Sequence, residues 1–109
     1  MNTQPEDLPE TNPATEWAIY NLDADLRIIS ANAAARAYWG RDLAEVLSRR
    51  LPEAFPEVLG TSVFEEHLRA MKSFEVFRDQ VMSPVLRRPI ELAIFPHLRG
   101  LRVAFRPTD

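Results

Sequence analysis

Two histidines are the first candidates for chemistry in this chain of 109 residues, because an imidazole can bind a metal or transfer a proton near neutral pH. His67 and His97 lie in different segments, and no third nitrogen or sulfur ligand has metal-like spacing with them. His97 follows Pro96 at a predicted turn, where we expect exposure to solvent. His67 stands beside Glu66 at the border of a predicted apolar stripe, where we expect a polar edge position. The histidines therefore predict no metal site.

The acidic and hydroxyl side chains form no recognisable catalytic set. Asp23 and Asp25 fit a turn. Glu65 and Glu66 are neighbours on a predicted helix, so their side chains diverge. No serine has a partnered histidine, the three glycines form no phosphate-binding loop, and the absence of cysteine excludes disulfides and cysteine nucleophiles. We therefore predict that the protein is not an enzyme. A small α+β-barrel enzyme with an Asp or Tyr in an apolar cone is a less favoured alternative.

The distribution of charge argues against a nucleic-acid surface. Of the 16 acidic residues, four lie within residues 1–16, which contain no Lys or Arg. The remaining 12 are balanced by 13 Lys and Arg in residues 17–109, so no basic excess is left to bind phosphates. Residues 1–16 also contain three prolines and predict a disordered acidic leader before a single domain at 17–109. With no apolar run near about 18 residues and no secretory leader, we expect a cytoplasmic chain without a membrane span.

The first half of the domain predicts a hairpin followed by a short helix. Residues 17–22 and 26–30 are rich in β-forming residues and are separated by the turn sequence DAD. Asn32 can cap a helix over 33–39, and Gly40 can end it in the left-handed conformation. The sequence DLAEVL then predicts a second helical turn, with Asp and Glu in capping-box spacing.

The second half predicts one longer helix and three strands. A connector rich in proline, RRLPEAFPEVLG, precedes a helix over 62–72 with Ser62 and Glu65 as its capping pair. Its apolar stripe consists of Val63, Phe64, Leu68 and Met71. Apolar residues alternate in the predicted strands 74–82, 89–96 and 101–105, so each strand has one face to bury. The fold class is therefore α+β, with a five-stranded antiparallel sheet, short helices on one face and the order ββααα(α)βββ.

Three segments in this order resemble a PAS domain over residues 17 to about 106. The stretch YNLDADLRIISANAAARAYWG has the form of the first two strands and the Asn-initiated, Gly-terminated helix of the family, with Asn32 and Gly40 at the matching places. SVFEEHLRAM resembles its longer helix, and ELAIFPHLRGLRVAFRPTD its last two strands. The ending FRPTD departs from the Asp-Ile-Thr of many PAS domains, which puts the usual acidic contact to the effector in doubt.

The resemblance implies a sensory, signal-transducing module that mediates protein–protein interaction. It implies a cavity between helix and sheet for a small apolar or aromatic ligand of unknown identity, and partners such as an effector domain and a second copy of the chain. We expect Leu68 and Met71 to face Leu92 and Ile94 across this cavity. The candidate lining residues, which also fit an ordinary core, are Tyr38, Trp39, Phe64, Leu68, Met71, Phe77, Leu92 and Ile94. A structural dimerisation domain without a ligand is the alternative.

Two cofactors of related domains are disfavoured. Some PAS domains hold haem through a histidine on the longer helix, but the matching position lies nearer Thr61 than His67. Flavin domains that form a cysteinyl adduct need a cysteine, and the chain has none.

Overall fold

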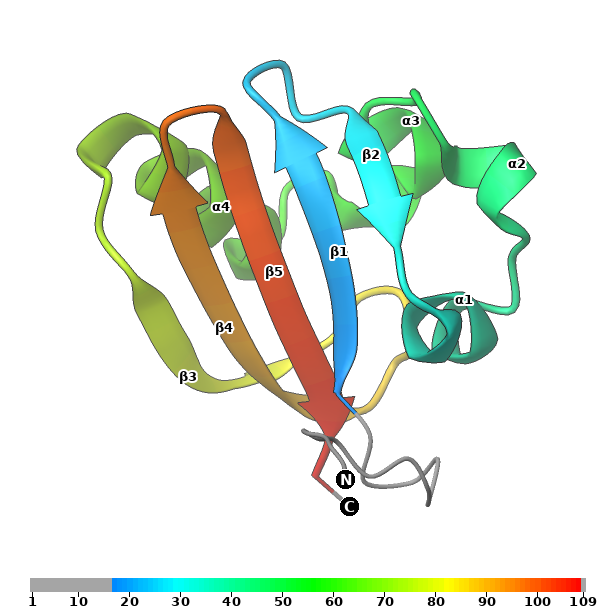
Figure 1. The fold of residues 1–109 in the computed structure, drawn as a ribbon. Coiled ribbons are helices and arrows are strands. Elements are labelled where there is room, and N and C mark those ends of the chain that lie inside the picture. The colour runs from blue at the N-terminus through cyan, green and yellow to red at the C-terminus, as the bar shows by residue number, and fades with distance from the viewer. Residues whose placement is uncertain (1–16, 109) are drawn as a thin grey trace, which may run out of the picture.

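A five-stranded antiparallel sheet organises the computed structural model, which describes residues 17–108 (Figure 1). The spatial order of the strands is β2-β1-β5-β4-β3, which places β5 at the centre between β1 and β4. The strands are β1 (Ala18–Asp23), β2 (Ile28–Ala31), β3 (Phe77–Met82), β4 (Pro89–His97) and β5 (Gly100–Pro107). The predicted α+β class and the order of elements are confirmed. The leader predicted for residues 1–16 lies outside the described residues.

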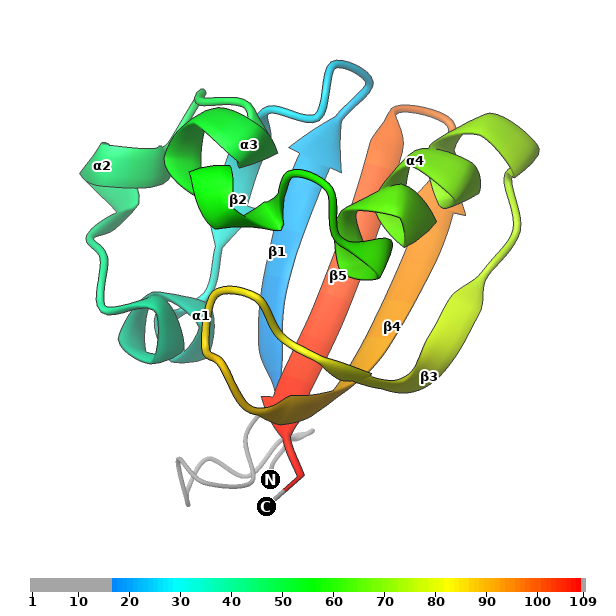
Figure 2. The same ribbon diagram turned by 180° about the vertical axis from the view of Figure 1, so that it is seen from behind.

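All the helices cover one face of this sheet, and the connection between β3 and β4 crosses the same face (Figure 2). The helical elements are α1 (Ala33–Trp39), α2 (Leu43–Val46), α3 (Leu51–Ala54), the 3-10 turn η2 (Pro56–Val58) and α4 (Ser62–Ser73). The proline-rich connector before α4 contains α3 and η2, which fits the further helix that the predicted order allowed. Pro52 and Pro56 stand at the first positions of these short helices, where the missing N–H has no intrahelical partner to lose.

Asn32 joins the start of α1 to the edge of β1. Its side-chain oxygen accepts hydrogen bonds from the backbone N–H of Ala35 at 2.9 Å and of Ile19 at 3.0 Å. Its amide group donates to the Trp17 carbonyl at 3.1 Å. Gly40 ends the helix with φ of 69°, a conformation that favours glycine because it has no Cβ. The short helix is therefore held at both ends by residues suited to those positions.

The α4 helix begins at Ser62 as predicted, but its capping residue and its end differ from the prediction. Thr61, not Ser62, is the N-cap: its hydroxyl oxygen accepts from the Phe64 N–H at 3.2 Å and its hydroxyl group donates to the Val58 carbonyl at 2.6 Å. The helix runs through Ser73, and Phe74 follows with φ of 61°. Phe74 is therefore not extended, and β3 begins at Phe77 and not at residue 74 as predicted.

The first and last strands of the domain are neighbours. Ala18 at the start of β1 pairs with Phe105 near the end of β5, so the described chain enters and leaves at the same end of the sheet (Figure 1). Along each central strand, alternate residues point toward the helices and form the core. These core residues are Ala18, Tyr20 and Leu22 of β1, Leu101, Val103 and Phe105 of β5, and Ile90, Leu92 and Ile94 of β4.

Candidate functional site

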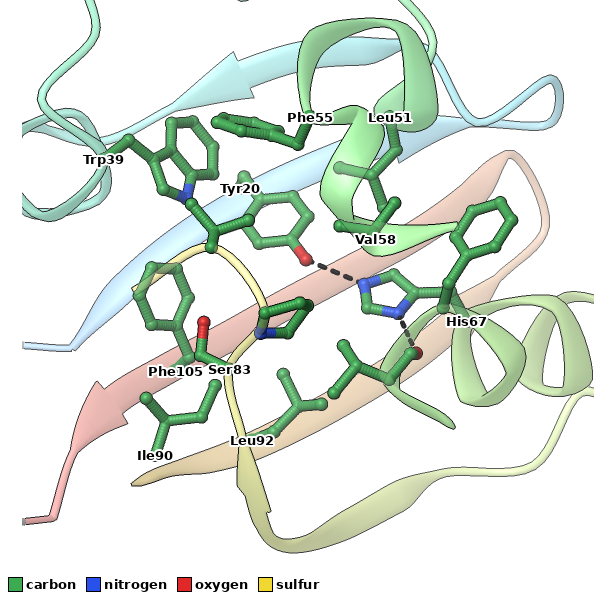
Figure 3. Close-up of a pocket in the computed structure, with 14 residues that line it drawn as sticks. Tyr20, Trp39, Leu51, Phe55, Val58, His67, Ser83, Ile90, Leu92 and Phe105 are labelled. Atoms are coloured by element: carbon green, nitrogen blue, oxygen red, sulfur yellow. Dashed lines mark hydrogen bonds between the residues drawn. The ribbon is translucent and has the colours of Figure 1, made fainter. Parts of the chain in front are cut away.

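A cavity of about 40 Å³ lies between the inner face of the sheet and the elements that cover it (Figure 3). The sheet, α1, the α3–η2 segment, α4 and the β3–β4 connection all contribute to its walls. The lining residues are Tyr20, Trp39, Leu51, Phe55, Val58, Val63, Phe64, His67, Ser83, Pro84, Val85, Ile90, Leu92 and Phe105. Most of these side chains are apolar, and none carries a charge at neutral pH.

The structure brings only some of the predicted lining residues to this cavity. Trp39, Phe64 and Leu92 line it. Ile94 is buried in the core without lining it, and Tyr38 packs its ring against Phe105 at a centroid distance of 5.9 Å. Met71 and Phe77 pack at the border of the core, and they do not line the cavity either.

The orientation of α4 overturns two predictions. Leu68 is 43% exposed and does not face the sheet, whereas His67, expected at a polar edge, is fully buried. The buried face consists of Val63, His67 and Ala70, which are spaced for one side of a helix. Successive helical residues differ in direction by about 100°, so a face centred on His67 turns Leu68 toward solvent. Ala70 is small enough to let the helix approach the sheet, which hydrophobicity alone did not reveal.

A buried tyrosine–histidine pair is the polar centre of the cavity. The Tyr20 hydroxyl lies 2.7 Å from Nε2 of His67, and Nδ1 of His67 lies 2.7 Å from the Val63 carbonyl oxygen. A carbonyl oxygen can only accept, so Nδ1 carries the ring proton and Nε2 is the acceptor. The Tyr20 hydroxyl therefore donates to His67, and both ring nitrogens are satisfied (Figure 3).

Burial keeps both members of this pair neutral. It lowers the pKa of His67 to about 4, partly opposed by the hydrogen bond to Val63. It also raises the pKa of Tyr20 well above its ordinary value of 10.0. At neutral pH the cavity therefore presents a hydroxyl and a neutral imidazole, with no ionised side chain in its wall.

Aromatic rings form a continuous wall beside the pair. The ring centroids of Tyr20 and Trp39 are 5.3 Å apart, those of Trp39 and Phe55 are 4.9 Å apart, and Phe105 lies 6.1 Å from Tyr20. From outside, the Arg41 guanidinium stacks over the Phe55 ring at 5.2 Å. Tilted rings at these separations pack favourably, so this side of the cavity is firmly held.

The β3–β4 connection crosses the helical face of the sheet (Figure 2). Its residues Ser83, Pro84 and Val85 line the cavity. Ser83 organises this connection: its hydroxyl oxygen accepts from the Leu86 N–H at 3.0 Å, and its N–H donates to the Arg88 carbonyl at 3.0 Å. The Arg87 N–H donates to the Ser83 carbonyl at 2.8 Å. Pro84 and Val85 are thereby held against the cavity.

Sequence reasoning missed the tyrosine–histidine pair and the part of the wall formed by the β3–β4 connection. Tyr20 and His67 are 47 positions apart, so no local spacing joins them. The alternation around Tyr20 was an available signal, because it places this residue on the same strand face as Ala18 and Leu22. The spacing of four residues between Val63 and His67 was a second one.

The profile that describes the PAS fold matches residues 13–104 of the chain. The chain belongs to the PAS family. No curated protein sequence matches it.

Solved structures of several other proteins share the architecture of this PAS domain. The PAS domain of the histidine kinase ThkA is 22% identical, with a TM-score of 0.73, over 87% of this chain and 100% of that one. A sensory box sensor histidine kinase from Vibrio cholerae is 13% identical, with a TM-score of 0.77, over 88% and 85%. A domain of an HTR-like protein from Haloarcula marismortui is 16% identical, with a TM-score of 0.69, over 90% and 100%. These likenesses show the fold.

The outer face of the PAS sheet is charged where the inner face is neutral. Glu91 lies between two arginines, at 3.3 Å from Arg78 and 3.4 Å from Arg106. The Arg106 guanidinium also stacks over the Trp17 ring at 4.3 Å. Ala93 pairs with Arg78 on β3 and is only 2% exposed, although it lies outside the core cluster. The long side chains of this face therefore cover its small central residues.

Two further features bear on function. Within residues 17–108, no group of three or more His, Cys, Asp or Glu side chains is placed to hold a metal ion. The longest helix there, α4, has 12 residues, and no described helix has the length and apolar character of a membrane span.

Proposed function

We propose that this PAS domain is the sensory module of a signalling protein, in which the state of the cavity alters the outer face of the sheet and thereby an effector. One observation carries the proposal: the segment that contains β1 contributes residues both to the cavity and to the outer face of the sheet. Tyr20 points into the cavity, whereas Ile19 alternates to the other face and Trp17 packs under Arg106 there. Trp17 is only three residues before Tyr20 in the chain, so a displacement of Tyr20 is transmitted along the backbone to the outer face.

The effector is a fused domain or an associated protein that contacts this outer face. Histidine kinases, the class to which ThkA and the Vibrio cholerae protein belong, are one class of effector that fits. We assign no catalytic step to the domain itself.

We also propose that the domain forms a homodimer through the outer face. Phe95 is 38% exposed on this face, opposite Arg102 of β5. Sedimentation of the full chain at increasing concentration tests the dimer, and Phe95→Lys is expected to shift it to monomer. A wild-type monomer at high concentration would contradict this part of the proposal.

A structural dimerisation domain is the second candidate, and the small size of the cavity favours it. A volume of about 40 Å³ is far below the roughly 300 Å³ or more of ordinary ligand pockets. In this alternative the cavity is a packing defect, and nothing that happens in it reaches the outer face.

The two tryptophans of the chain allow a direct test. Trp39 lines the cavity and Trp17 lies on the outer face, so 5-fluorotryptophan gives one fluorine NMR resonance for each place. Val58→Ala changes the cavity wall, and Leu59→Ala is the matched control because Leu59 is the next residue and is 59% exposed. We expect Val58→Ala to shift both resonances and Leu59→Ala to shift neither. A shift confined to Trp39 would favour the structural alternative.

A further inference from the structure

The size of the cavity restricts what can occupy it. Its volume of about 40 Å³ exceeds the roughly 10 to 15 Å³ that one water molecule needs in a cavity, but is far below the roughly 150 Å³ of an engineered cavity that binds benzene. Aromatic side chains already fill the wall formed by Trp39, Phe55 and Phe105. An occupant of this arrangement therefore has only a few non-hydrogen atoms and no ring.

The charge of the lining residues restricts the occupant further. No Asp, Glu, Lys or Arg lines the cavity. The polar pair is fixed as a hydroxyl that donates to a neutral imidazole, so it offers no counter-ion. An anion or cation placed here would lose its hydration without compensation. The occupant is therefore neutral.

Besides the Ser83 hydroxyl, which already accepts from Leu86, two polar groups of the wall can bind an occupant. The Tyr20 hydroxyl uses its proton on His67, and within residues 17–108 nothing donates a hydrogen bond to its oxygen. The indole N–H of Trp39 likewise has no acceptor within the described part of the chain, and its edge faces the interior of the pocket (Figure 3). One acceptor and one donor face the same small space, and a hydroxyl or a primary amide can satisfy both.

We infer that the cavity binds a neutral alcohol or primary amide of about two to four non-hydrogen atoms, whose polar group bridges Tyr20 Oη and the Trp39 indole N–H. The inference rests on the proposed function, because it names the class of ligand for the same cavity. Tyr20 and Trp39 are its binding residues, and His67 positions Tyr20 by accepting its proton.

The test uses small probes and the full chain labelled with 5-fluorotryptophan. Ethanol and acetamide are the neutral probes, and acetate and ethylammonium are charged molecules of matched size. We expect ethanol and acetamide to shift the Trp39 resonance saturably, with a Kd in the millimolar range that is usual for so few atoms. Acetate and ethylammonium should cause no saturable shift beyond that of sodium chloride. Free 5-fluorotryptophan in the same solutions corrects for the effect of the solvent.

The hydrogen bond to Tyr20 is tested without relying on a variant that must fold. The chain has two tyrosines, Tyr20 in the cavity wall and Tyr38 outside it, so 3-fluorotyrosine gives a probe and an internal control. Ethanol should shift the Tyr20 resonance saturably and leave that of Tyr38 unchanged. Tyr20→Phe, which retains the ring, should then weaken ethanol binding about three- to tenfold.

The outcomes separate this inference from the proposed function. No saturable response at Trp39, or an equal response to acetate, would overturn the ligand class, even if Val58→Ala still moves Trp17 and so supports the sensory role. A response at Trp39 that never reaches Trp17 would support the ligand class and overturn the relay to the outer face. Responses at both tryptophans support both.

Discussion

The two faces of one sheet use opposite kinds of interaction. On the inner face the Tyr20 hydroxyl and the neutral His67 imidazole are buried together, and each ring nitrogen of His67 has one hydrogen-bond partner. On the outer face Glu91 is shared by Arg78 and Arg106, which are partly exposed. Buried polar groups are costly to leave unpaired, whereas exposed ion pairs exchange partners at little cost. The inner face is therefore specified by fixed pairs, whereas the ion pairs of the outer face can rearrange.

The largest loss of stability is expected from a change in the backbone, which does not depend on the contrast between the two faces. Gly100 begins β5 with φ of 151°, and a Cβ there would overlap the carbonyl oxygen of Leu22. We expect Gly100→Ala to lower the free energy of unfolding by more than about 3 kcal/mol, measured by denaturant titration. Gly60→Ala is the control: Gly60 also has positive φ, but no atom lies within 4 Å, so a cost of about 1 kcal/mol is expected. Equal costs would mean that β1 and β5 can move apart.

The second largest effect is expected when the pH is lowered, because it acts on the buried histidine of the inner face. The pKa of His67 is lowered to about 4 from an ordinary 6.5, so between these values the unfolded chain binds a proton that the folded chain does not. The free energy of unfolding should therefore fall as the pH is lowered from about 6.5 to about 4, by an amount on the order of 3 kcal/mol. Denaturation across this range measures the slope. Tyr20→Phe/His67→Leu should lack this part of it, whereas His97→Gln, at an exposed histidine, should retain it.

The contributions of Tyr20 and His67 to the free energy of unfolding should depend on each other. Tyr20→Phe leaves Nε2 of His67 buried without a donor, and we expect a cost of about 1 to 3 kcal/mol. His67→Leu leaves the Tyr20 hydroxyl without its acceptor. The double variant removes both polar groups, so its cost should be smaller than the two single costs added together. Additive costs in thermal or chemical unfolding would show that the two side chains do not depend on each other.

The smallest effect is expected on the outer face. Glu91→Gln removes the charge that two arginines share, and we expect a loss of less than about 1 kcal/mol, reduced further by salt. Glu66→Gln, which disrupts the pair of Glu66 with Arg69 at 3.5 Å on α4, is a matched ion-pair control. A loss of several kcal/mol for Glu91→Gln alone would mean that the outer face is as tightly specified as the inner one.

Local signals predicted much of the fold. Asn32 and Gly40 bracket α1 at the predicted residues, because capping depends on neighbouring positions. The alternation of Ile90, Leu92 and Ile94 identified β4 and its buried face in the same way. The bounds of the short helices in the connector before α4 were not predicted, because proline is as common at the start of a helix as in a turn.

The cavity was harder to predict because its shape depends on how α4 rotates against the sheet. Hydrophobicity placed Leu68 inside and His67 at an edge, yet close approach to the sheet selects the face with Ala70. The acceptor that makes His67 tolerable in the core is Tyr20, from a strand 47 positions away. Such a pairing becomes visible only when the two elements are placed together.

The adjacent ends of β1 and β5 have a mechanical consequence. Tension applied at residues 17 and 108 would pull these antiparallel neighbours apart from the same end, beginning at the pair of Ala18 and Phe105. The hydrogen bonds between the strands would then break one after another, as in a zipper, and would not share the load. Tyr20 is the third residue of β1, so an early step of such peeling would draw its hydroxyl away from His67. A modest pull on the ends of this domain would therefore open its cavity before it unfolds the rest of the sheet.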